Sequence, residues 1–410
     1  MNDESTPTSS RLPPPAESAA PAAPERSDPR RAPSPPSATV RARLAELFVP
    51  VGSILLLAMM IGLILGTAGK TLGYDYSCYA GAARNLLDGK AIYDNAFSIN
   101  VGTCPGTYTY PPAFAVALVP WLSLGGAAAG LWCVAMALCF LAGAALLPVR
   151  RDVRWLVVIL AALNWPLLYA VKLGQVEPIL FLGFAAAWRW MDEAAVVGAA
   201  TAVGALIKVQ PGLLAVWAIA TGRYRAAAIG ISATVALAAA ATFVTGTSAW
   251  LAYVDLLRGL GATLVTPHNF APGAIAYQAG APENVATAVQ LASAAVALAA
   301  LLAAWRFASP VASLQVTIVA SQLISSPLRD HYAVLMLLPT AWLVARGRTW
   351  AIVFPLLGWI ALFADGEQSV WPAAASVPVT FFGCLAAVLL EGLVERRSGT
   401  SPARAAMAPE

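Results

Sequence analysis

Long apolar runs alternate with short polar segments along the chain from Phe48 onward. The first run, from Phe48 to about Leu65, is long enough to cross about 30 Å of hydrocarbon as a helix. Similar runs recur at about 125–148, 155–170, 178–190, 194–206, 211–221, 226–246, 284–305, 311–325, 333–345, 349–364 and 371–391. The pattern predicts an all-α integral membrane protein, a bundle of about 12 spans, several shorter than the usual ~20 residues. Residues 113–122 are too short to span, and we expect them to dip into the membrane edge.

The composition agrees with a location in lipid. Of the 410 residues, 59% are hydrophobic and only 11% are charged, with a mean hydropathy of +0.70. A soluble domain carries about a quarter charged residues, so a wholly soluble or disordered chain is excluded. The unbroken apolar runs also disfavour an outer-membrane barrel, whose strands alternate apolar and polar residues.

Metal and nucleotide motifs are absent from the sequence. The five cysteines and two histidines form no CxxC, HExxH or DxD spacing, and there is no GxGxxG or GxxxxGK loop. We therefore expect no metal, no cofactor and no nucleic-acid partner, with membrane lipids as the surroundings.

The charge distribution predicts the orientation. Residues 1–44 hold ten prolines and no apolar period, which predicts a disordered cytoplasmic tail. Basic residues then recur in alternate turns, as the positive-inside rule expects of cytoplasmic turns: Arg150, Arg151, Arg154, Arg189, Arg223, Arg225, Arg306, Arg346, Arg348, Arg396 and Arg397. We therefore expect a transmembrane domain at 45–395 and a short cytoplasmic tail at 396–410, in the inner (plasma) membrane.

In this orientation the other set of turns, on the non-cytoplasmic side, holds the unusual polar groups. They include Asp75, the 172–178 turn, Lys208 and the Arg329-Asp330-His331 segment. Ionisable groups near lipid are costly and usually have a task or a partner. We expect several of them to line one cavity that faces away from the cytoplasm, where a lipid-borne substrate can enter.

The first non-cytoplasmic loop is predicted to contain a helix directly after Asp75. Ala80, Ala83 and Leu86 have helical spacing, and the Asp-Gly pair at 88–89 ends the helix.

Five segments, in order, carry a family resemblance. They are LLDGKAIYD at the end of this helix, YTYPP, GQVEPILFLGFAAA, ALIKVQPGLLAVWAI and SSPLRDHYAVLMLLP. With an acidic residue right after the first span, they resemble the polyprenyl-phosphate-dependent membrane glycosyltransferases of the GT-C fold, most closely the mannosyltransferase-like family 87. The resemblance covers roughly residues 48–345, with Glu177 where the family usually has Asn.

The resemblance implies a GT-C-like enzyme that moves a hexose, expected to be mannose, from a polyprenyl-phosphate sugar to a lipid or glycan acceptor. The reaction is expected on the periplasmic (extracytoplasmic) face. Asp75 matches the family's general base, and direct displacement assisted by a single base inverts the anomeric centre. The alternative is that Asp75 merely caps the helix that follows it.

A leaving phosphate needs cations or N–H donors, and Lys208, Arg329 and His331 are the candidates. Alternatively, Lys208 is a snorkelling lysine at a helix end, and the other two form an interfacial salt bridge with Asp330.

Gln175 and Tyr76 are candidates for contact with the sugar. Alternatively, Gln175 closes a tight interhelical turn, and Tyr76 belongs to the aromatic belt at the membrane interface.

Cys78 and Cys104 are the only two cysteines predicted outside the cytoplasm, on a side that permits disulfides. We predict that they form a bond worth roughly 3 kcal/mol, which holds the helix after Asp75 against the turn that re-enters the membrane.

Two other interpretations stay open. A twelve-span secondary transporter predicts internal repeats with helices broken at matching points, and no convincing repeat is seen. A non-catalytic scaffold or lipid-binding subunit predicts that Asp75→Asn is tolerated.

Overall fold

The structure, a computed structural model, describes residues 36–93, 108–260, 269–325, 327–358 and 373–398, and within these ranges the chain forms helices and no strand. The chain divides into two compact units, Met1–Phe48 and Val49–Glu410. The first helix, α1 (Pro36–Thr67), begins in the smaller unit, inside the predicted tail of residues 1–44. Pro36 suits the first turn of a helix, and the Ala, Arg and Leu residues that follow it favour helix.

Five helical segments of the described residues are long and apolar enough to cross a membrane. They are residues 48–67 of α1, the Pro112–Leu146 run, α10 (Tyr224–Gly259), α12 (Glu283–Phe307) and Ser376–Arg397 within α16 (Ala373–Ser398). A bent pair, α5 (Arg151–Ala162) and α6 (Trp165–Leu173), meets at 66° and makes a sixth segment if it is one span.

Several runs that the sequence predicts as spans form short helices. These are α7 (Glu177–Arg189), α8 (Ala194–Ile207), α9 (Leu213–Ala220), α13 (Pro310–Leu323) and α14 (Leu337–Ala345), of 8 to 14 residues each. At 1.5 Å per residue, even the longest extends over about 21 Å, less than the ~30 Å hydrocarbon layer. The structure therefore does not confirm the predicted count of about 12 spans, although the apolar runs do coincide with helices.

Residues 113–122, predicted to dip into the membrane edge, belong to a near-continuous helical run. In this run α3 (Pro112–Leu118) passes into the 3-10 segment η2 (Val119–Ala127) and then into α4 (Ala128–Leu146). Pro120 stands in the first turn of η2, where the fixed φ of proline is compatible with a helical backbone. The run bends at Gly125, whose φ is 56°.

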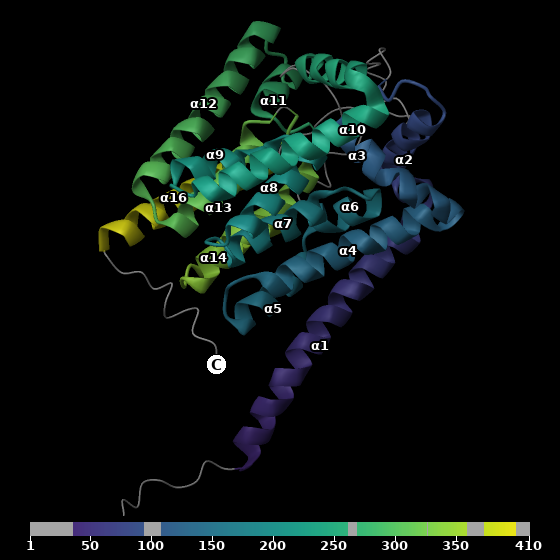
Figure 1. Ribbon diagram of the computed structural model, residues 1–410. Helices are drawn as coiled ribbons and strands as arrows, with labels where there is room; N and C mark the ends of the chain where they lie inside the picture. The colour runs from purple at the N-terminus through teal and green to yellow at the C-terminus, as the bar shows by residue number, and fades with distance from the viewer. Residues whose placement is uncertain (1–35, 94–107, 261–268, 326, 359–372, 399–410) are drawn as a thin grey trace, which may run out of the picture. The chain divides into compact units, whose positions relative to one another are not determined.

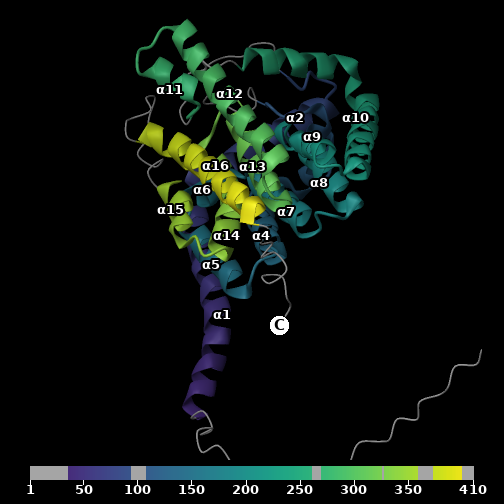
Figure 2. The same cartoon turned by 90° about the vertical axis from the view of Figure 1, so that its left-hand side faces the viewer.

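Helices of the larger unit pack closely side by side. α10 lies along α8, and α4 lies along α7 (Figure 1). Figure 2 shows α16 lying across α13, which also contacts α12. A Cβ atom added to Gly198 of α8 would lie 2.6 Å from Ile229 of α10, so the glycine permits this close approach.

The remaining elements are short and mostly frame the cavity described below. They are η1 (Gly69–Thr71), α2 (Tyr74–Leu87), η3 (Gln210–Gly212), α11 (Pro272–Gln278), η4 (Asp330–Met336), η5 (Thr349–Ile352) and α15 (Val353–Leu357). α2 confirms the predicted helix in the first loop, with Asp88 as its C-cap and Gly89 in the left-handed region at φ 66°.

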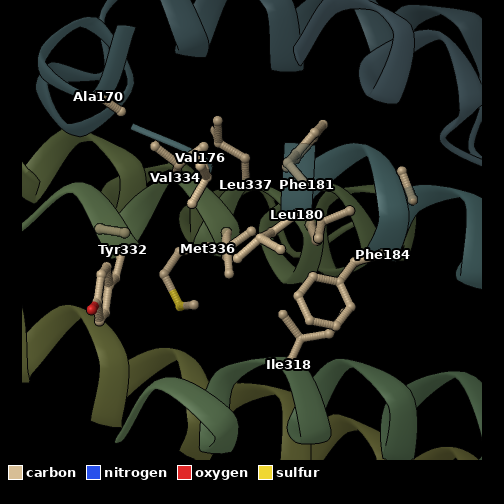
Figure 3. Close-up of a cluster of buried hydrophobic side chains, with 14 of the residues drawn as sticks. Ala170, Val176, Leu180, Phe181, Phe184, Ile318, Tyr332, Val334, Met336 and Leu337 are labelled. Carbon is tan, nitrogen blue, oxygen red and sulfur yellow. The ribbon is translucent and has the colours of Figure 1, made fainter. Parts of the chain in front are cut away.

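An apolar cluster from α7 and α13 packs against η4. Figure 3 shows Leu180, Phe181 and Phe184 of α7 together with Ile318 of α13 and Met336 of η4. Every residue of η4 is buried, so the segment that carries His331 is firmly packed.

Candidate active site

One cavity of about 840 Å³ gathers most of the predicted site residues. Its walls come from α2, the turn between α6 and α7, the segment around η3, the end of α10 and the segment that leads into η4. The predicted residues that line it are Asp75, Cys78, Gln175, Lys208, Arg329 and His331. Turns that are far apart in the sequence therefore share one cavity, as the sequence predicts.

Asp75 lies in the first turn of α2, where the backbone of Gly73 positions it. Gly73 is the N-cap at φ 64°, and its N–H donates to the carbonyl oxygen of Lys172 at 2.8 Å. A Cβ on Gly73 would lie 2.9 Å from the Cβ of Ala129, so this position requires glycine. Among the described residues no side-chain hydrogen bond caps the N-terminus of α2, so the half-buried Asp75 carboxylate is not acting as the cap.

The turn between α6 and α7 places Gln175 against Asp75. Gly174 ends α6 in the left-handed region at φ 73°, and the N–H of Gln175 donates to the carbonyl of Ala170 at 2.8 Å. The indole N–H of Trp132 donates to the carbonyl of Gly174 at 2.7 Å. The Nε2 of Gln175 then donates to the Oδ2 of Asp75 at 2.6 Å.

The surroundings of Asp75 act on the pKa of its carboxyl in opposite directions. Burial raises the pKa of its carboxyl above the ordinary value, because the protein replaces water around the charged form. The nearby His331 and the hydrogen bond from Gln175 act in the opposite direction, and so does Arg329. A carboxylate with a raised pKa accepts a proton more readily than an exposed one.

Lys208 forms a buried ion pair with Glu177, the residue that stands where the family resemblance leads one to expect Asn. The Nε2 of His331 lies 3.7 Å from the same Glu177 oxygen, and its Nδ1 lies 3.4 Å from the Oδ1 of Asp330. The Lys208 ammonium also lies 4.0 Å from the ring centroid of Tyr332. The charge of Lys208 is therefore balanced within the protein, although Lys208 is also one of the residues that line the cavity.

Arg329 lines the cavity next to the Asp75 carboxylate. It is partly exposed, and its charge acts on both Asp75 and Tyr74. Among the residues that the structure describes, no three His, Cys, Asp or Glu side chains gather closely enough to hold a metal ion.

One described residue of the predicted site, Tyr76, is not brought to the cavity. Tyr76 is 4% exposed and packs on Trp132, with ring centroids 5.7 Å apart, and it is absent from the cavity wall. Cys78 is disulfide-bonded. Its predicted partner, Cys104, lies outside the described residues, so the pairing itself stays a prediction.

Sequence reasoning did not select several tyrosines that contribute to the site. Tyr79, Tyr110 and Tyr332 line the cavity, and the first two donate hydrogen bonds to the Gln175 side chain. A signal existed for Tyr79, because it lies four residues after Asp75 and so shares its helix face.

The part of the chain that the structure describes is thus that of a helical membrane protein, whose cavity combines a carboxylate with nearby cationic groups. It belongs to glycosyltransferase family 87, whose model matches residues 108–327, more than half of the chain. No curated protein and no solved structure matches it. The matched segment contains Gln175, Glu177 and Lys208, whereas Asp75, Arg329 and His331 lie outside it. Membership makes the protein a GT-C-type glycosyltransferase and disfavours both the transporter and the scaffold interpretation.

Proposed function

We propose that this glycosyltransferase moves a hexose, mannose, from a polyprenyl-phosphate sugar to a lipid or glycan acceptor, with inversion at the anomeric carbon. The observation that carries the proposal is the convergence of Asp75, Arg329 and His331 on one cavity. A base for the acceptor and cations for the leaving phosphate are the two groups that this transfer needs.

In the proposed reaction the acceptor hydroxyl oxygen attacks the anomeric carbon as the bond from that carbon to the phosphate oxygen breaks. The hydroxyl proton passes to the Asp75 carboxylate, and the electron pair of the broken bond leaves with the polyprenyl phosphate. Attack opposite the leaving group inverts the anomeric centre. A single carboxylate is enough, because no covalent sugar–enzyme intermediate is formed.

Arg329 and His331 are the proposed contacts of the leaving phosphate. Lys208 can donate a further N–H hydrogen bond, but Glu177 already balances its charge, so its electrostatic attraction for phosphate is weaker. Arg329 is suited to the task because a guanidinium offers paired N–H donors to phosphate oxygens.

The proposed location of the reaction is the non-cytoplasmic face of the inner (plasma) membrane. The support is the alternation of basic turns along the sequence, which puts the turns that line the cavity on the opposite side from the basic turns assigned to the cytoplasm. A sugar carried on a polyprenyl phosphate can reach this side, whereas nucleotide sugars stay in the cytoplasm.

The test is a comparison of lipids and glycans from a strain lacking the gene, complemented by native protein, Asp75→Asn or Asp88→Asn. Asp88 is the exposed C-cap of the same helix and serves as a matched control. We expect one mannosylated product to disappear in the deletion strain and to return with the native protein and Asp88→Asn only. Transport of substrate into sealed proteoliposomes without product would instead support the transporter interpretation.

A further inference from the structure

A closed hydrogen-bond network surrounds the side-chain amide of Gln175. Its Oε1 accepts from the hydroxyl of Tyr110 at 2.8 Å and from that of Tyr79 at 3.1 Å. Its Nε2 donates to Asp75 at 2.6 Å. The two hydroxyls also contact each other at 2.9 Å, and Gln175 is only 6% exposed.

This network fixes which end of the amide faces Asp75. A hydroxyl carries one hydrogen, and among the described residues the hydrogens of Tyr79 and Tyr110 have only the Gln175 oxygen and each other's oxygens as acceptors. A flipped amide would place its oxygen against the Asp75 carboxylate, and two acceptors would then face each other at hydrogen-bond distance. The ionised carboxylate and the two tyrosines therefore select the same orientation.

The amide has little capacity left for a substrate. Its oxygen already accepts two hydrogen bonds, and one of its two N–H groups is committed to Asp75. Contact with the sugar, which the sequence suggests for Gln175, therefore explains the geometry less well than contact with the base.

We propose that Gln175 is a positioning residue that orients the Asp75 carboxylate and stabilises its ionised form, with Tyr79 and Tyr110 holding the amide in place. The inference rests on the proposed role of Asp75 as general base. In this arrangement one Asp75 oxygen is held by Gln175, and the other is left for the acceptor hydroxyl.

Other ionisable groups also act on Asp75 and must be kept unchanged in a test. His331 and Arg329 favour the ionised carboxylate from the segment around η4, and Glu177 disfavours it from α7. Removing the Gln175 donor while these three remain should make Asp75 hold its proton to a higher pH.

A direct readout is the reaction of dicyclohexylcarbodiimide with Asp75 in the full-length purified protein. This reagent attacks protonated carboxyls in apolar surroundings, so labelling of the Asp75 peptide against pH, followed by mass spectrometry, reports its protonation. We expect Gln175→Leu to move the labelling midpoint upward by about one to two pH units, the effect of losing one hydrogen bond to a charged group. Tyr110→Phe should move it upward by less, because the amide keeps Tyr79.

Gln315→Leu is the matched control, because Gln315 is fully buried in α13 and its amide has no hydrogen-bond partner among the described residues. It should leave the midpoint unchanged. An unmoved midpoint in Gln175→Leu overturns the proposal. If that variant does not fold, an unmoved midpoint in Tyr110→Phe overturns it.

The kinetics of transfer separate positioning from substrate binding. With mannosyl phosphoryl polyprenol as the donor, we expect Gln175→Leu to lower kcat about 10- to 100-fold with KM nearly unchanged. A raised KM at native kcat would support sugar contact instead and overturn the proposal. Activity retained by Asp75→Asn would refute the base role alone, because the labelling result does not depend on transfer.

Discussion

Replacing Lys208 tests whether its ammonium forms a stabilising ion pair with Glu177, as the structure indicates. The side chains of the pair are 9% and 1% exposed, and the second carboxylate oxygen of Glu177 has no hydrogen-bond partner among the described residues. Lys208→Met keeps the length of the aliphatic stem and removes the charge, so that a carboxylate stays buried without its principal partner.

The expected loss is about 3–5 kcal/mol of unfolding free energy, the usual effect of breaking a buried pair from one side. The exposed pair of Lys90 and Asp88, at 2.9 Å and with side chains 66% and 54% exposed, gives the comparison. Lys90→Met should change stability by at most about 1 kcal/mol, because water screens that pair.

The assay is reversible unfolding in mixed detergent micelles, followed by tryptophan fluorescence. The double variant Glu177→Gln with Lys208→Met should recover most of the loss, because no buried charge is left unpaired. Lys208→Met alone should also regain stability as the pH falls, because a proton then neutralises the unpaired carboxylate.

Native stability in Lys208→Met at neutral pH would refute this reasoning. So would a double variant as unstable as the single one. Either result would mean that the Lys208 charge is available to a substrate phosphate, as the sequence alone suggests.

Three further outcomes are expected. The rate of transfer should fall as the pH drops through the Asp75 pKa, because a protonated carboxyl cannot accept the acceptor's proton. Burial raises that pKa, so a pH–rate profile should place the midpoint of this fall above about pH 3.9, the ordinary aspartate value. Gly174→Ala should lower the thermal unfolding midpoint and destabilise the protein by about 1–3 kcal/mol, because the φ of Gly174 is 73° and a Cβ there would lie 2.9 Å from Trp132. Gly183→Ala is the control and should leave the midpoint unchanged, because a Cβ there meets open space. For the predicted Cys78–Cys104 bond, intact mass after alkylation should show two thiols that become reactive only on reduction, and Cys78→Ser should lower the unfolding free energy by about 3 kcal/mol. Two freely alkylated thiols in the native protein would contradict the bond.

Periodicity and charge predicted the helical class, the helix after Asp75 and the shared cavity. These features depend on apolar spacing and on the cost of ionisable groups in lipid, both of which are legible in a sequence. The number of spans could not be predicted reliably from the sequence. Apolar runs of 13 or 14 residues, such as α7 and α8, have the same composition whether they cross a membrane or pack inside a bundle.

The partners of the site residues depended on tertiary contacts that no local pattern encodes. Lys208 and Glu177 are separated by 31 positions, and Gln175 and Asp75 by 100. The sequence therefore identified these residues as unusual, but it did not show that Lys208 pairs with Glu177 or that Gln175 donates a hydrogen bond to Asp75. Tyr79 shares the helix face of Asp75 and lines the cavity, whereas Tyr76, one residue after Asp75, lies on another face of α2.

The most direct test of the central claim is the single-turnover transfer of radiolabelled mannose from mannosyl phosphoryl polyprenol to membrane lipid acceptors by purified native protein and by Asp75→Asn. Donor retention by each protein is measured in parallel. We expect Asp75→Asn to bind the donor normally and to transfer at least about 100-fold more slowly, because only the proton acceptor is lost. Near-native transfer by Asp75→Asn would contradict the account.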